Sequence, residues 1–145
     1  MQTITYFYRA VLATAVASML AFTACQTTGS GDPIAEYNAN PLSVTIPDGV
    51  SSSEADRQSA LTLANRGWSV TSRESGSVTG QIAQGRYQST VNLKQEGGEV
   101  RIYVRSGTYR RSPDAEGRDA IPRNWLNFLQ RDLTARLATA ALGEE

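Results

Sequence analysis

The middle of the chain alternates apolar and polar residues with the period of two that is typical of β-strands. The alternation covers residues 68–72, 78–82, 87–93 and 100–104, and a shorter strand is predicted at 43–46. Turn signals at Gly76-Ser77 and at Glu96-Gly97-Gly98 predict β-hairpins. Because each strand has one apolar and one polar side, the pattern indicates antiparallel strands with one solvated face.

Two other stretches show helical spacing. Residues 54–68 follow three serines that can cap a helix, and Gly67 is typical of the position after a helix end. The second helix is predicted from Pro122 onward, with an apolar stripe of Trp125, Leu126, Leu129, Leu133, Leu137 and Ala140. This order predicts an α+β fold, a two-layer sandwich in which one antiparallel sheet of about four to five strands carries two helices on one face.

The first 25 residues have the organisation of a secretory signal. Arg9 precedes an apolar run at residues 10–22, which is shorter than the roughly 20 residues of a membrane span. The segment Phe22-Thr23-Ala24-Cys25 resembles the bacterial lipobox, with phenylalanine in place of the usual leucine. The resemblance implies that residues 1–24 are a lipoprotein signal peptide and that Cys25 carries the lipid.

The residues after the lipobox divide into two predicted parts. Residues 25–41 are expected to be the lipidated cysteine and a flexible tether, because they are polar, rich in Gly, Ser, Asn and Pro, and without periodicity. Residues 42–145 are expected to form one small domain. Gln26 stands where an inner-membrane lipoprotein would have Asp, so the same resemblance implies an outer-membrane location facing the periplasm, held through the lipid on Cys25.

The domain also carries a second resemblance. It depends on Arg66-Gly67-Trp68 at a helix end, Ile102-Tyr103 in a strand, and Asn124-Trp125 with Leu129 in the last helix. These features, over about residues 55–135, resemble a group of small uncharacterised proteobacterial lipoproteins. Such proteins often have a His and a Tyr before the last Trp, where this chain has Ile121, Pro122 and Arg123. The resemblance implies no activity.

Composition argues against several kinds of chemistry. The chain has no histidine and a single cysteine, so Ser-His and Cys-His catalysis have no base and a zinc site would retain only carboxylates. A formal net charge of zero gives no case for a nucleic-acid partner. No phosphate loop or dinucleotide fingerprint is present. We therefore expect no cofactor, no metal site and no catalytic residues.

The clearest charged feature is a set of arginines interleaved with tyrosines. Arg101 and Arg105 are predicted to share the outer face of one strand, with Tyr103 between them. Arg110 and Arg111 follow closely. Such a row can bind phosphate or carboxylate groups, so these five residues are the candidate site for an acidic envelope partner. The alternative is a solvated face with arginine stems lying over tyrosine rings.

Together these features predict a membrane-anchored envelope lipoprotein that acts as a non-catalytic binding or accessory module. One alternative is a structural subunit of an outer-membrane complex, which would associate through a sheet edge or the open sheet face. Another is a hydrolase that works through two carboxylates. Its candidate acids are Glu74, Glu96 and Glu99 near turns, and Asp114, Glu116 and Asp119 in a loop.

Overall fold

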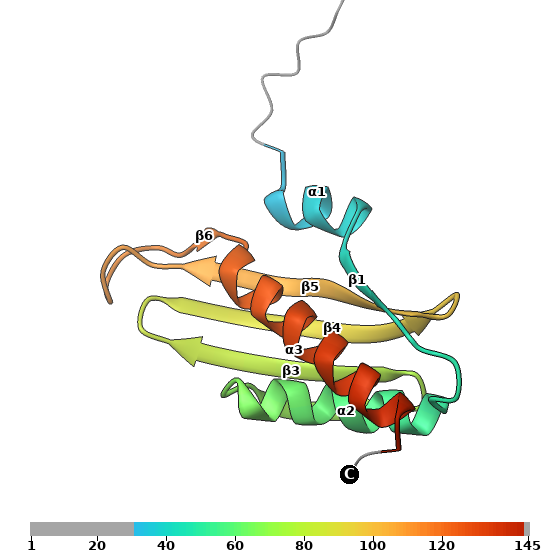
Figure 1. The fold of residues 1–145 in the computed structure, drawn as a ribbon. Helices are drawn as coiled ribbons and strands as arrows, with labels where there is room; N and C mark the ends of the chain where they lie inside the picture. The colour runs from blue at the N-terminus through green and yellow to red at the C-terminus, as the bar shows by residue number, and fades with distance from the viewer. Residues whose placement is uncertain (1–30, 144–145) are drawn as a thin grey trace, which may run out of the picture.

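The computed structural model describes residues 31–143, so Cys25 and the predicted signal peptide lie outside the described residues. The described part of the chain forms one antiparallel sheet and three helices, which confirms the predicted α+β class (Figure 1). The elements are α1 (Pro33–Ala39), β1 (Leu42–Thr45), α2 (Ser52–Asn65), β2 (Ser69–Glu74), β3 (Ser77–Gln84), β4 (Tyr87–Glu96), β5 (Glu99–Tyr109), β6 (Arg118–Asp119) and α3 (Arg123–Ala141).

The sheet has the strand order β1-β5-β4-β3-β2, and β6 also pairs with β5. Strands β2 to β5 follow one another through tight turns, and Gly76, Gly85, Gly97 and Gly98 provide the positive φ angles that such turns need. The longest pairing joins β4 to β5, from Tyr87↔Tyr109 to Glu96↔Glu99. Counting the two-residue β6, the sheet has six strands, one more than the upper end of the predicted range.

The apolar sides of the strands and of the two longer helices build the core. Leu93 lies opposite Val78 on one side and Ile102 on the other, and all three are buried. A Cβ atom added to Gly80 would lie 3.0 Å from both end methyl groups of Leu63, so this glycine lets α2 approach the sheet closely. The predicted stripe of α3 is confirmed at its leucines, because Leu126, Leu129, Leu133 and Leu137 are fully buried.

The N-terminal part of the fold corrects the predicted tether at residues 25–41. Residues 33–39 form the helix α1, whose first turn is capped by Asp32, since the Ile34 N–H donates to Asp32 Oδ1 at 2.8 Å. Tyr37 is buried, and its hydroxyl donates to the Ile102 carbonyl at 2.8 Å. The folded domain therefore begins by Asp32 and not at residue 42.

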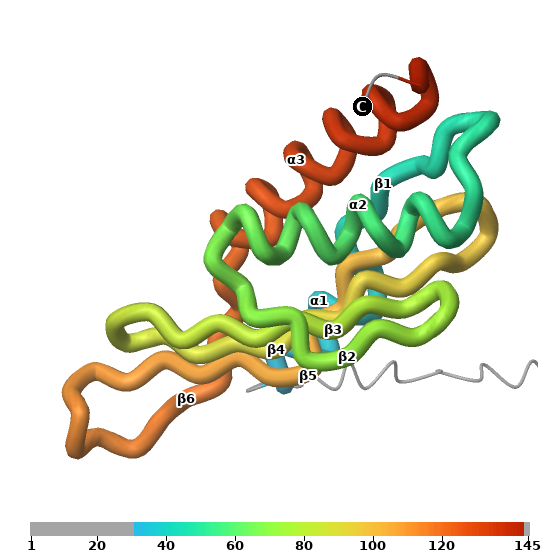
Figure 2. Tube along the Cα trace, turned by 90° about the horizontal axis from the view of Figure 1, so that it is seen from below, coloured from blue at the N-terminus to red at the C-terminus, as the bar shows by residue number. Residues whose placement is uncertain are grey.

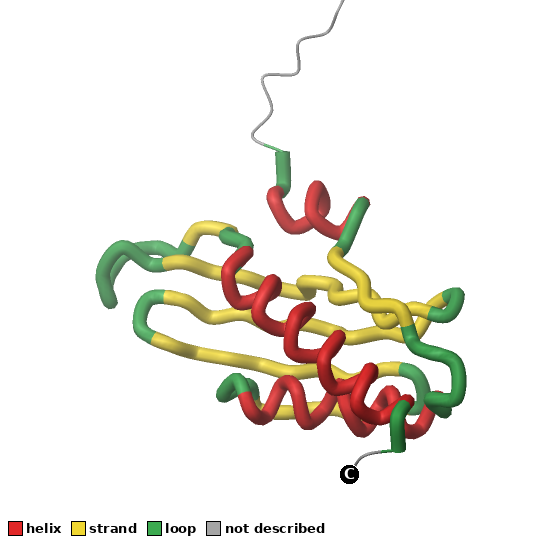
Figure 3. The backbone as a smooth tube through the Cα atoms, viewed as in Figure 1, coloured by secondary structure: helices red, strands yellow, loops and turns green. Residues whose placement is uncertain are grey.

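Smaller differences concern the end of the chain. The strand predicted at residues 100–104 continues to Tyr109 in β5, and the two-residue β6 lies in the following stretch of chain, which Figure 3 shows folding back at one end of the sheet. Pro122 is the N-cap of α3 and not a residue of its first turn. No helix in the described range 31–143 has both the length and the apolar composition that a membrane span requires.

Candidate functional site

Two of the five predicted site residues, Arg101 and Tyr103, lie on β5 within a network of opposite charges. Arg101 lies 3.6 Å from Glu96 and 3.5 Å from Glu99, measured between nitrogen and oxygen atoms. The Tyr103 hydroxyl donates to Glu96 Oε2 at 2.9 Å, and the Lys94 ammonium lies 2.7 Å from Glu96 Oε1. The two cations and two carboxylates balance, so this part of the face presents no free positive charge to an anion.

Hydrogen bonds to Glu96 keep that balance at neutral pH. The bond from Lys94, followed by the bond from the Tyr103 hydroxyl, lowers the pKa of the Glu96 carboxyl. The carboxylate therefore stays charged, and an incoming anion would have to compete with it for Lys94 and Arg101.

The other three predicted residues lie elsewhere. Val104 pairs with Val91 and Ser106 with Thr90, so Arg105 is the extra residue of a β-bulge and has no partner on β4. Arg110 and Arg111 are exposed and follow the end of β5. The bulge breaks the regular alternation on which the prediction depended, and the five residues do not form one continuous row. Their role in binding stays a prediction.

A band of aromatic rings lies at one end of the sheet. Ring centroids are 4.7 Å apart for Tyr109 and Tyr87, 5.7 Å for Tyr87 and Trp125, and 6.2 Å for Trp125 and Trp68. Phe128 lines a hollow of about 210 Å³ together with both tryptophans. We call these five residues the aromatic band.

The rings of the band differ in their exposure. Trp68 is 3% exposed and belongs to the core, whereas Trp125, which the sequence places in the apolar stripe of the last helix, is only partly buried. Tyr87 is 37% exposed and Phe128 is 41% exposed. Figure 2 shows that the β3–β4 hairpin, after which β4 begins at Tyr87, extends beyond the ends of α2 and α3. The band is therefore anchored in the core and open to solvent at its outer rings.

Arginines flank the aromatic band at both ends. The guanidinium groups of Arg66 and Arg131 lie 5.1 and 5.2 Å from the centre of the Phe128 ring. At the other end, the Arg118 guanidinium lies 5.2 Å from the centre of the Tyr109 ring. These distances are typical of cation–π contacts. A cation–π contact holds a guanidinium group beside a ring and does not itself occupy an N–H donor.

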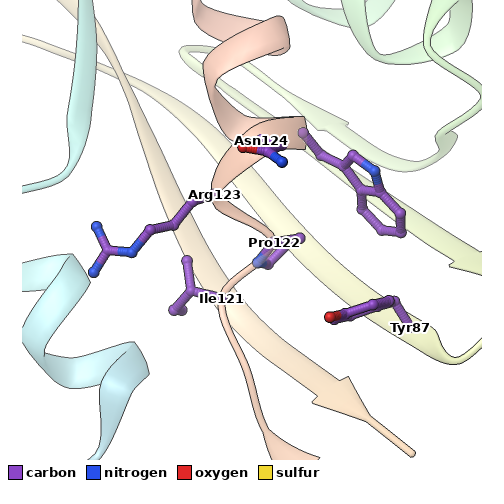
Figure 4. Close-up of a pocket in the computed structure, with 6 residues that line it drawn as sticks. Tyr87, Ile121, Pro122, Arg123 and Asn124 are labelled. Carbon is purple, nitrogen blue, oxygen red and sulfur yellow. The ribbon is translucent and has the colours of Figure 1, made fainter.

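A larger hollow, of about 310 Å³, lies where α3 begins. Tyr87, Ile121, Pro122 and Trp125 line it, together with Arg123 and the adjoining Asn124. Figure 4 shows Tyr87 on one side of the chain, and it shows the Arg123 side chain extending toward α1 on the other side. Apolar side chains combined with a few polar groups are typical of the lining of binding sites, and Tyr87 and Trp125 make this hollow continuous with the aromatic band.

Three acidic residues have a pKa shifted in the direction opposite to the one that a general acid requires. Glu54, Glu96 and Asp132 have a lowered pKa, in each case first through a hydrogen bond from a neighbouring arginine or lysine. A general acid at neutral pH needs a raised pKa instead. Within residues 31–143, no group of three or more His, Cys, Asp or Glu side chains could hold a metal ion. Glu54, Glu96 and Asp132 thus act as partners of cations.

The fold therefore defines a small α+β domain with aromatic rings and arginines gathered at one end of its sheet. No protein-family model, no curated protein and no solved structure matches the chain.

Proposed function

We propose that the protein is a membrane-anchored envelope lipoprotein that acts as a non-catalytic binding or accessory module, with the aromatic band as its contact surface. The observation that carries the proposal is the chain of rings from Tyr109 to Trp125, held at successive centroid distances of 4.7 and 5.7 Å between flanking arginines. Tryptophan, tyrosine and arginine contribute most of the binding energy at many interfaces, because they combine a large apolar area with polar groups at the tip.

The proposed anchor is lipid on Cys25, in the outer membrane and facing the periplasm. Six residues separate Cys25 from Asp32, the N-cap of α1. A chain of that length reaches at most about 25 Å when fully extended. Each CH₂ group of a lipid chain that enters the bilayer contributes about 0.8 kcal/mol of binding free energy, and two or more chains are needed for stable anchoring. The domain in this proposal is thus held close to the membrane surface.

The proposed architecture places α2 and α3 on one face of the sheet. Three observations support it: the two helices contact each other, α2 contacts β2 and β3, and Leu63 of α2 lies against Gly80 of β3. The opposite face then carries polar side chains such as Thr79, Asn92 and Tyr103. The exposed rings of the aromatic band lie apart from that polar face, on the first turns of α3 and at the start of β4.

The sheet edges disfavour the alternative of a structural subunit that associates edge to edge. The free edge strand β2 has a bulge between Val70 and Ser72, followed by the exposed charges of Arg73 and Glu74. The opposite edge strand, β1, has four residues. Bulges, charges and short strands are features with which proteins prevent edge pairing.

The test of the proposed function replaces Cys25 by alanine in cells fed radiolabelled palmitate. We expect the parent protein to be labelled and to sediment with membranes, and the Cys25→Ala protein to be unlabelled and soluble in the periplasm. Thr27→Ala is the matched control, because it changes a nearby polar residue and should leave labelling intact. Unlabelled parent protein, or label that survives in the Cys25→Ala protein, would contradict the anchor.

A further inference from the structure

We propose that the aromatic band is a membrane-contact surface, which docks onto anionic phospholipid headgroups and lays the domain against the bilayer. The proposal rests on the lipid anchor of the proposed function, and it names anionic lipid headgroups as the partner of the aromatic band.

The exposed rings provide the apolar part of the contact. Four large hydrophobic residues are exposed in the described part of the chain, and two of them, Tyr87 and Phe128, belong to the aromatic band. The partly buried Trp125 lines the hollows on either side of it, of about 310 and 210 Å³. Tryptophan and tyrosine rings favour the headgroup region of a bilayer, because one part of the ring is apolar and the other forms hydrogen bonds.

The arginines beside the rings provide the charged part. Arg118, Arg123 and Arg131 are exposed, and within the described residues their guanidinium groups donate no hydrogen bond. The N–H groups of Arg118 and Arg123 are therefore free for phosphate oxygens, and those of Arg131 are shared with one ion pair to Asp132. Arg66 differs, because its Nη2 donates to Asp132 at 2.9 Å. Asp132 lies 3.8 Å from Arg131 as well, and it is the one described carboxylate within ion-pair distance of these four arginines.

The position of the anchor favours a membrane over a protein as the occupant of this surface. The chain enters the fold at Asp32, and α1 lies on the side toward which Arg123 extends from the larger hollow (Figure 4). With at most about 25 Å of chain between Cys25 and Asp32, lipid on Cys25 keeps the whole small domain near the bilayer, within reach of a surface contact. A short tether keeps the aromatic band at a high local concentration relative to the lipid headgroups, so a weak contact is enough to dock the domain.

The first experiment uses the chain from residue 25 onward with Cys25→Ser, so that no lipid contributes to binding. It is mixed with vesicles of equal parts phosphatidylglycerol and phosphatidylcholine that contain brominated lipid, which quenches nearby tryptophan. The chain has two tryptophans, and Trp68 is 3% exposed, so we expect quenching to occur through Trp125. The Trp125→Phe protein should lose the quenching, and the corresponding Trp68→Phe protein should keep it.

The second experiment measures vesicle binding of matched variants by sedimentation. Phe128→Ala should weaken binding about tenfold through lost apolar burial, and Leu61→Ala, an equally exposed apolar residue outside the band, should not. Arg131→Gln should weaken binding about fivefold, whereas Arg73→Gln on β2 makes the same charge change without effect. High salt should reduce binding of the parent protein. Urea midpoints for every variant establish that each one is folded.

Unquenched Trp125, or equal binding of the Phe128→Ala and Leu61→Ala proteins, would overturn the proposal. If vesicles do not bind while Cys25 is labelled with palmitate, the anchor stands and the band has to be assigned to a protein partner. If vesicles bind but Cys25 is unlabelled, the anchor fails while the membrane contact stands. The two proposals are therefore tested separately.

Discussion

Replacing Asn38 by alanine should destabilise the whole domain, although Asn38 lies in a stretch with the composition of a linker. Its Nδ2 donates to the Val104 carbonyl at 2.7 Å, and its Oδ1 accepts from the Val104 N–H at 2.9 Å. Strand β1 pairs with β5 as far as Ile102, and β6 pairs with β5 from Thr108 onward. Val104 lies between these two pairings, so the Asn38 amide forms the hydrogen bonds that a neighbouring strand would otherwise form. Val104 is 1% exposed, so its backbone depends on this side chain.

The structure sets the expected magnitude. Asn38→Ala leaves one backbone donor and one backbone acceptor without partners, and each unsatisfied buried group costs about 1–3 kcal/mol. We expect a loss of about 2–4 kcal/mol in the free energy of unfolding. This is below the largest possible sum because Asn38 is only partly buried, so water can reach the vacated space. That loss is a large share of the roughly 5–15 kcal/mol that stabilises a domain.

The assay is equilibrium unfolding in urea, followed by circular dichroism. Asn40→Ala is the matched control, since Asn40 is exposed at the end of the same helix, and it should change stability by less than about 0.5 kcal/mol. Asn38→Asp is a second variant that keeps the acceptor for the Val104 N–H but loses the donor to its carbonyl. At neutral pH it should be destabilised as well, because its carboxylate faces that carbonyl oxygen.

A loss for Asn38→Ala no larger than that for Asn40→Ala would refute the reasoning. It would mean that α1 detaches from β5 without loss of folding free energy, and that water forms the hydrogen bonds to the backbone groups at this edge of β5.

Two further predictions concern other tertiary contacts. Asp132→Asn should lower stability at neutral pH, because the bond from Arg66 lowers the pKa of Asp132 in the folded state. That contribution is complete above the unfolded pKa of about 3.9 and is lost as the pH falls through the lower folded pKa, so the urea midpoints of variant and parent should converge in strong acid. Gly107→Ala should cost roughly 1–3 kcal/mol, because its Cβ would overlap the Ala120 carbonyl oxygen, whereas Gly31→Ala meets nothing within 4 Å. A thermal melt unchanged by Gly107→Ala would contradict the docking of residues 118–121 against β5.

The elements that the sequence predicts well are those with strong local signals. Ser51 caps α2, with the Glu54 N–H donating to its Oγ at 3.1 Å, and Gly67 follows the helix with a φ of 79°. The glycine turns and the alternating runs locate β3, β4 and β5 in the same way. These signals depend on residues a few positions apart, so no knowledge of the fold is needed to use them.

The elements that the sequence missed are short and are held by distant contacts. The seven-residue α1 is too short to be stable by itself, and it is stabilised where Tyr37 and Asn38 reach β5, about 65 residues further along the chain. The two-residue β6 depends likewise on its pairing with Thr108 and Tyr109. Neither contact leaves a periodic trace in the sequence.

The candidate surfaces show the same division. The sequence by itself determined the residue types, the α+β class and the places where strands and long helices form, because these follow from local periodicity and turn chemistry. Only the tertiary structure decided that Glu96 and Glu99 neutralise Arg101 and that a bulge displaces Arg105. Only the register Tyr87↔Tyr109 and the packing of α3 bring the rings of the aromatic band together. Which charges are cancelled and which rings meet solvent depends on distances between residues far apart in the chain, and those distances exist only once the sheet and helices have packed.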